Sequence, residues 1–83
     1  MGGVFIFFIM RFRGKGGLKV IVNGKIMGFE EGITILDLLK KLNLSKEKVV
    51  VELNYNIIAK EQFTEILLNK EDKVEIVSFV GGG

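Results

Sequence analysis

The residues best placed to do chemistry are the last three, Gly81-Gly82-Gly83, because they present a carboxylate that no side chain crowds. Glycine has no Cβ atom, so such a tail is thin and adopts backbone angles that other residues avoid. It can thread a narrow channel and place the Gly83 carboxylate beside the phosphate of a nucleotide. The alternative is a frayed, solvated terminus, where disorder often concentrates. The tail alone leaves both interpretations open.

The residue types that are missing narrow the chemistry further. The chain has no Cys, which excludes a thiolate nucleophile, a persulfide, a disulfide and a Cys-ligated metal site on this chain. It has no His, the usual general base at neutral pH and the commonest metal ligand. The remaining polar groups show no spacing typical of a catalytic site. We therefore expect no catalytic residue, no metal site and no enzyme activity of the chain by itself.

The net charge of +2 is unevenly distributed. Arg11, Arg13 and Lys15 lie in the first seventeen residues, which contain no acidic residue. From Leu18 onward, nine Lys face ten Asp and Glu, a net charge of −1. The main part of the chain therefore lacks the basic surface of a nucleic-acid binder, and we expect no nucleic-acid partner.

Residues 1–17 form an N-terminal extension that differs from the rest. The apolar run Val4–Met10 precedes a basic, Gly-rich linker at residues 11–17. The run is far shorter than the roughly 20 residues of a membrane helix, and its charges lie on the wrong side for a signal peptide. We therefore expect no membrane partner and a cytoplasmic location.

The role of this extension has three interpretations. It can add a strand to a sheet edge, act as an apolar arm in self-association, or be an artefact with the natural start near Leu18. We favour the last, because residues 18–80 resemble a complete domain that is followed by the flexible tail 81–83.

The domain begins with a predicted β-hairpin and a helix. Leu18–Val22 and Lys25–Phe29 are rich in β-formers and flank Asn23-Gly24, the strongest short hairpin signal. Thr34 and Asp37 form a capping-box-like pair at the start of the helix. The apolar helix face consists of Ile35, Leu38, Leu39 and Leu42, and Asn43 is a plausible left-handed stop.

Three further strands are predicted. Residues 49–53 are almost continuously apolar, which indicates a central strand. A short strand at 57–59, a helical turn at 60–63 and a last strand at 73–80 follow. The class is α+β: one main helix packed on a mixed sheet of four to five strands, in a ubiquitin-like β-grasp order.

Alternation along the last strand places Val77 and Phe79 on one face of the strand and Val74 and Ile76 on the other face. Val77 and Phe79 are therefore candidates for an exposed patch that docks a partner. The alternative, that Phe79 belongs to the core, is equally open. Lys60 and Glu61 are best interpreted as solvated surface.

Several segments together carry a family resemblance. They are Lys19-Val20-Ile21-Val22-Asn23-Gly24-Lys25, Thr34-Ile35-Leu36-Asp37-Leu38-Leu39, Val51-Glu52-Leu53-Asn54, Ile57-Ile58-Ala59-Lys60-Glu61-Gln62-Phe63 and Val77-Ser78-Phe79-Val80-Gly81-Gly82-Gly83. Over residues 18–83 the chain resembles the ThiS family of sulfur carrier proteins of thiamine biosynthesis, in the MoaD/ThiS superfamily. Glu71-Asp72 replaces a Gly-Asp turn that is frequent in the family.

The resemblance implies that a ThiF-like adenylating enzyme, with ATP and Mg²⁺ as its own cofactors, activates the Gly83 carboxylate. Sulfur from a cysteine desulfurase or another persulfide-bearing protein then replaces AMP and leaves a thiocarboxylate on Gly83. Gly81 and Gly82 supply access to the partner. A ThiG-like thiazole synthase takes the sulfur into the thiazole of thiamine.

Other functions stay open at this point. The small subunit of molybdopterin synthase uses the same chemistry, although the Phe79-Val80-Gly81 approach to the tail is more similar to the thiamine carrier. A protein modifier would join Gly83 to target lysines, and a plain interaction domain would need no glycine tail.

Overall fold

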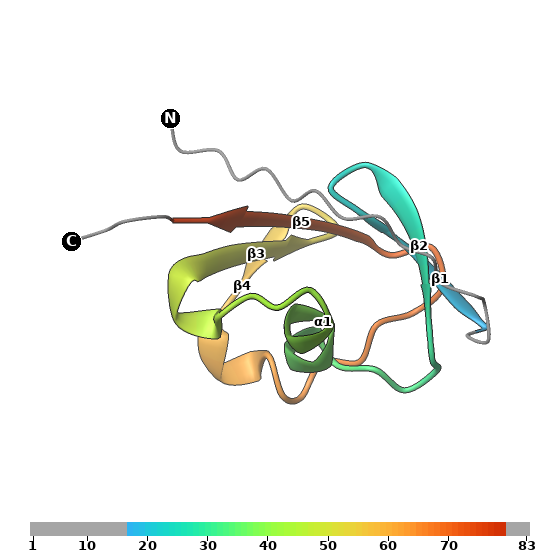
Figure 1. Ribbon diagram of the computed structural model, residues 1–83, viewed down its shortest axis with the longest axis horizontal. Coiled ribbons are helices and arrows are strands. Elements are labelled where there is room, and N and C mark those ends of the chain that lie inside the picture. Colours follow the sequence, from blue (N-terminus) through green and yellow to red (C-terminus); the bar gives the residue numbers. More distant parts are fainter. Residues whose placement is uncertain (1–16, 80–83) are drawn as a thin grey trace.

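The computed structural model describes residues 17–79, so residues 1–16 and 80–83 lie outside the described part. The elements are β1 (Leu18–Val22), β2 (Lys25–Phe29), α1 (Ile35–Lys41), η1 (Lys46–Lys48), β3 (Val49–Leu53), β4 (Asn56–Ile58), η2 (Lys60–Gln62) and β5 (Lys73–Ser78). The strands form one five-stranded sheet in the order β2-β1-β5-β3-β4 (Figure 1). The predicted α+β class, with a mixed sheet and one main helix, is confirmed.

The first hairpin forms where the sequence predicts it. β1 and β2 are antiparallel, with Leu18 paired to Phe29 and Val22 paired to Lys25. Asn23 and Gly24 have positive φ angles of 48° and 84°. Such angles suit a hairpin turn whose twist matches the flanking strands, which explains the choice of Asn and Gly.

The middle of the sheet is β5, not β3. β5 pairs in parallel with β1, and Ile21 lies beside Lys73. On its other side β5 pairs antiparallel with β3, and β3 continues to the edge strand β4. The prediction of a central strand at residues 49–53 is therefore correct in one respect: β3 is an interior strand, between β5 and β4, although it is not the middle strand of the sheet. Its apolar run reflects burial of alternate residues, because Val49 and Val51 are buried whereas Val50 is 36% exposed.

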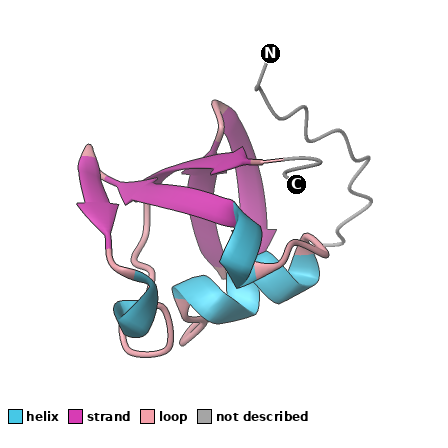
Figure 2. Cartoon of the chain, turned by 90° about the vertical axis from the view of Figure 1, so that its left-hand side faces the viewer, coloured by secondary structure: helices cyan, strands magenta, loops and turns pink. Residues whose placement is uncertain are grey.

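Helix α1 begins with the predicted capping box. The Thr34 hydroxyl accepts a hydrogen bond from the Asp37 N–H at 3.0 Å, and the Asp37 carboxylate accepts one from the Thr34 N–H at 3.0 Å. After the helix, Asn43 takes the predicted left-handed conformation with φ of 62°. Helix α1 and the 3-10 turns lie on one side of the sheet (Figure 2).

The core lies between this helical side and the sheet. Its buried members are Leu18, Val20, Val22, Phe29, Ile33, Ile35, Leu38, Leu39, Val49, Val51, Phe63, Leu68, Val74 and Ile76. Leu42, from the predicted apolar helix face, and Leu53 are partly buried against it. Within residues 17–79, no helix or strand covers the opposite side of the sheet, which we call the outer face (Figures 1 and 2).

Two asparagine side chains tie the hairpin turns to β5. Asn23 Nδ2 donates to the Ile76 carbonyl at 3.2 Å, and Asn23 Oδ1 accepts from the Ile76 N–H at 2.7 Å. Asn54 Nδ2 donates to Asp72 Oδ1 at 3.0 Å, and Asn54 Oδ1 accepts from the Lys73 N–H at 2.9 Å. Asn23 thereby continues the β1–β5 ladder beyond its last strand pair. Both turns are fixed by contacts with residues far away in the sequence.

The capping box leads to a prediction about pH. Its hydrogen bonds with the backbone and side chain of Thr34, together with Lys40 and Lys41, lower the pKa of Asp37 from its ordinary value. A lowered folded-state pKa means that the ionised carboxylate contributes stability above its unfolded pKa, about 3.9, and that this contribution is lost as pH falls through the folded-state pKa. In urea denaturation we expect Asp37→Asn to be less stable than the native chain at pH 7 and to approach it in the acid range.

Two variants complete this experiment. Thr34→Ala removes the hydroxyl acceptor and is expected to cost about 1 kcal/mol of unfolding free energy at pH 7. Glu65→Gln removes one negative charge at an exposed position outside the capping box and serves as the control for the loss of a carboxylate. An Asp37→Asn deficit that stays constant through the acid range would contradict the prediction.

Candidate docking surface and C-terminal tail

Strand β5 carries the chain toward its C-terminal glycines. The ordered backbone continues past the strand, because the Phe79 N–H donates to the Lys48 carbonyl at 2.7 Å. The C-terminal end of β5 points away from the loop that joins β2 to α1 (Figure 1). Gly81, Gly82 and Gly83 lie outside the described residues, so the predicted attachment site and its access residues stay predictions.

An apolar patch lies on the outer face beside this end of β5. Val77 is 43% exposed and Phe79 is 51% exposed, so Phe79 is not part of the core. Val50 on β3 lies directly opposite Val77 in the register. We call Val50, Val77 and Phe79 the outer patch. Their position on an uncovered sheet face suits contact with another protein surface.

Val50 was missed in the sequence because it lies inside the run Val49-Val50-Val51. A continuous apolar run does not show which residues point toward the helix. The pairing of β3 with β5 decides it, since side chains directly opposite each other lie on the same face. The sequence did contain one signal for Val50. Because side chains two positions apart in a strand lie on the same face, Val50 shares the face of the polar residue Glu52 and not that of Val49 and Val51.

An acidic pair lies next to the outer patch. Glu52 and Glu75 are directly opposite each other on β3 and β5 and share the face of Val50 and Val77. Like charges in this arrangement repel each other. Within residues 17–79, the one ion pair joins Lys60 Nζ to Glu47 Oε1 at 3.3 Å, so neither carboxylate is neutralised by a salt bridge there.

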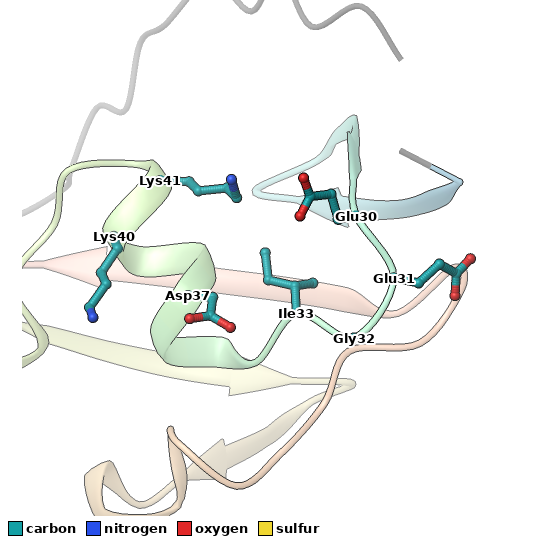
Figure 3. Close-up of a pocket in the computed structure, with 7 residues that line it drawn as sticks. All are labelled: Glu30, Glu31, Gly32, Ile33, Asp37, Lys40 and Lys41. Atoms are coloured by element: carbon teal, nitrogen blue, oxygen red, sulfur yellow. The ribbon is translucent and has the colours of Figure 1, made fainter. Parts of the chain in front are cut away.

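A shallow depression of about 380 Å³ lies between helix α1 and the β2–α1 loop. Its lining residues are Glu30, Glu31, Gly32, Ile33, Asp37, Lys40 and Lys41 (Figure 3). Asp37 uses its carboxylate for the helix cap, where hydrogen bonding to Thr34 lowers its pKa. A carboxylate held ionised in this way is a poor general base, so the depression does not resemble a catalytic site.

Two further polar side chains, those of Lys60 and Tyr55, have structural contacts. Lys60 pairs with Glu47, and both are exposed, which is typical of a weak surface ion pair. Tyr55 lies in the β3–β4 turn with φ of 73°, and its hydroxyl lies 3.3 Å from Lys73 Nζ. Among residues 17–79, no three Asp or Glu side chains lie close enough to hold a metal ion, and no helix has the length and apolarity needed to cross a bilayer.

Comparison with known proteins places this architecture in a family. The ThiS family pattern matches residues 20–83, from strand β1 through the last glycine. The chain belongs to the ThiS family. The ThiS sulfur carrier protein of Bacillus subtilis (strain 168) is 44% identical over 63 residues, which cover 75% of this chain and 96% of that protein.

The fold of a solved ThiS structure agrees with this assignment. The crystal structure of the thiamine biosynthesis protein ThiS from Geobacter metallireducens matches with a TM-score of 0.68 and 33% sequence identity. The match covers 80% of this chain and 100% of that one. The predicted family and the ubiquitin-like ThiS fold are therefore confirmed.

Larger relatives carry a ThiS-like segment. A thiazole synthase of Paramagnetospirillum magneticum is 38% identical over 66 residues, and one of Magnetococcus marinus is 35% identical over 66 residues. In each case this chain spans 20% of the length of the relative. Two proteins named thiazole synthase thus each contain a segment that is similar to this chain.

Proposed function

We propose that this chain is a sulfur carrier of thiamine biosynthesis whose working group is the Gly83 carboxylate. The observation that carries the proposal is the family match, which runs to residue 83 and so includes the three glycines. The chain contains no Cys that could hold the sulfur instead. The carrier is acted on by other enzymes and is not itself a catalyst.

Activation begins at the Gly83 carboxylate oxygen. It attacks the α-phosphate of ATP in a ThiF-like enzyme, which holds the Mg²⁺, and pyrophosphate leaves. The resulting acyl adenylate is a good electrophile because AMP is a good leaving group. Two access residues without side chains, Gly81 and Gly82, let the terminus enter the nucleotide site.

Sulfur then replaces the adenylate. The terminal sulfur of a persulfide on the donor protein attacks the Gly83 carbonyl carbon, and AMP leaves. A second thiol then attacks the donor's cysteine sulfur and breaks the sulfur–sulfur bond of this adduct. The thiocarboxylate stays on Gly83, and a disulfide forms between the donor's cysteine and the attacking thiol. Thiazole synthase is the proposed acceptor, supported by the relatives in which a ThiS-like segment belongs to a protein of that name.

Intact-mass measurement tests the proposal. After incubation with ATP, an adenylating partner and a sulfur donor, the full chain should gain the mass difference between sulfur and oxygen, and fragmentation should locate it at Gly83. Omission of ATP should prevent the change. Conjugates of Gly83 with lysine side chains, in place of the thiocarboxylate, would identify a protein modifier and contradict the proposal.

The outer patch is the proposed docking surface for the adenylating enzyme. We expect Phe79→Ala to weaken binding of that enzyme about tenfold, because a buried aromatic anchor at an interface contributes more than 1 kcal/mol. Val77→Ala should have a smaller effect. Titration calorimetry with the adenylating enzyme measures both affinities.

The matched control for these variants is Leu67→Ala. Leu67 is 53% exposed, similar to Phe79, but it pairs with Thr34 on the helical side of the molecule. Its removal should leave the affinity unchanged. Equal losses from Leu67→Ala and Phe79→Ala would show that the outer patch is not the docking surface.

A further inference from the structure

Strand β2, at one edge of the sheet, turns unpaired backbone groups outward. The Ile21 N–H donates to the Asp72 carbonyl at 2.9 Å, on the side of β5. Ile21 therefore points its backbone groups away from β2, and its antiparallel partner Ile26 points its own groups away from β1. Gly28, two residues further along β2, points the same way. The edge thus offers two N–H and two carbonyl groups to a further strand.

The side chains of β2 favour close approach of that strand. Ile26 is 73% exposed and lies on the outer face, directly opposite Ile21. Gly28 lies on the same face, two positions away, and has no side chain. A glycine inside a strand often marks a place where another backbone approaches closely. The other edge strand, β4, has only three residues and no glycine, so β2 is the better template.

The charges around β2 indicate which strand fits. Lys25 begins the strand, and Glu30 and Glu31 follow its end. Lys40 and Lys41 line the nearby depression, yet no lysine of residues 17–79 forms an ion pair with either carboxylate. A strand that is cationic at its start and acidic after its end complements a copy of itself in the antiparallel direction, because opposite charges then meet at both ends. In the parallel direction like charges would meet.

We propose that β2 pairs antiparallel with β2 of a second copy of this chain, about a two-fold axis at Met27. In this register Ile26 of each copy exchanges backbone hydrogen bonds with Gly28 of the other. All four outward-facing backbone groups of each strand are then paired. The two five-stranded sheets join into one continuous sheet.

Each side-chain contact occurs twice in this pairing, because a two-fold interface uses the same surface on both copies. The exposed Ile26 side chain lies opposite Gly28 of the second copy, where it meets no side chain. The Met27 side chains of the two copies meet on the other face of the sheet. Lys25 comes next to Glu30 and Glu31 of the second copy. Backbone, apolar and charged contacts thus all agree with one register.

The dimer is expected to be weak and reversible. A single strand pair buries less surface than a standard interface of roughly 1,600 Å², so we expect a Kd of the order of 100 µM. Strand β1 separates β2 from β5, so the outer patch and the C-terminal end of β5 stay uncovered. The inference rests on β2 and its flanking charges alone and does not depend on the proposed function.

Sedimentation and amide hydrogen exchange of the full chain test the pairing. Sedimentation equilibrium between about 10 µM and about 1 mM should show a monomer–dimer equilibrium. Over the same range, exchange of the Ile26 and Gly28 amides should slow several-fold, whereas that of Ile57 on the edge strand β4 should stay constant. Ile26→Ala should raise the Kd at least about fivefold, because its contact is lost twice.

Charge variants test the direction of the pairing. Lys25→Glu should raise the Kd about tenfold, because it brings like charges together at both ends of the strand pair. Addition of Glu30→Lys and Glu31→Lys exchanges the charges and should restore the native Kd. Lys46→Glu makes the same charge change at an exposed position on η1 and should leave the Kd unchanged.

Controls separate this interface from other causes of association. Ile57 is 71% exposed, similar to Ile26, so Ile57→Ala removes an equally exposed side chain from the other edge and should not change the Kd. Amide spectra of each variant report whether the fold is intact. A chain that stays monomeric at about 1 mM would overturn the proposal, as would a dimer that is indifferent to Ile26→Ala and Lys25→Glu. Slow exchange at Ile26 and Gly28 that does not depend on concentration would assign the edge to the chain's own N-terminal segment and contradict the pairing.

Discussion

Deletion of Gly83 alone is expected to reduce sulfur acceptance at least about 100-fold, although the shortened chain still ends in a glycine carboxylate. The reason is reach: removal of one residue withdraws the carboxylate by about 3.5 Å from the phosphate that it must attack. Displacement of a reacting group by even 1 Å costs about 100-fold in rate. Single-turnover formation of the thiocarboxylate, followed by intact mass, measures the loss.

Comparison variants distinguish reach from chemistry. Amidation of the Gly83 carboxyl group keeps the length and removes the nucleophilic oxygen, so it should abolish acceptance completely. Gly82→Val keeps both the length and the carboxylate but adds a branched side chain, and it should also slow acceptance. Deletion of Met1 shortens the chain equally at its other end and should have no effect. Unchanged acceptance without Gly83 would contradict the argument from reach, and acceptance by the amidated chain would exclude the terminal carboxylate as the sulfur site.

Asn23→Ala is expected to destabilise the fold by about 2–4 kcal/mol, because it leaves the part-buried N–H and carbonyl of Ile76 without their side-chain partners. It also forces Ala into a backbone with φ of 48°. For a domain of this size the loss corresponds to a fall in Tm of roughly 10–25 °C. Thermal and urea unfolding followed by circular dichroism measure both quantities.

Asn43→Ala is the matched control for the backbone. Asn43 also has a positive φ, 62°, but its side chain has no hydrogen bond within the described residues. It should cost only the left-handed backbone strain of about 1–2 kcal/mol. Asn23→Gly relieves that strain at position 23 and still loses the contacts with Ile76. If Asn23→Ala were no worse than Asn43→Ala, the side-chain bridge would not stabilise the sheet.

The local elements were predictable because their determinants lie within a few residues of one another. The turn at Asn23-Gly24 needs two positive φ angles, and these residue types adopt them readily. The capping box joins Thr34 and Asp37, three positions apart in the sequence. Such features follow from covalent geometry and side-chain reach, and the wider chain changes them little.

The order of the strands in the sheet could not be predicted from neighbouring residues in this way. Pairing of β5 with β1 and β3 brings together residues more than twenty positions apart. It was this pairing that placed β5 in the middle and exposed Val50 on the outer face. Residues 49–53 had suggested a central strand because hydrophobicity reports burial and not order in a sheet.

For the candidate site, residue type and order identified the glycine tail, the absence of Cys and His, and Val77 and Phe79 as docking candidates. These follow from chemistry that a residue either has or lacks. Only the tertiary structure decided that Phe79 lies outside the core. It also showed that two carboxylates oppose each other beside the outer patch. Exposure and cross-strand neighbours depend on which strands meet, and long-range pairing determines that when the chain folds.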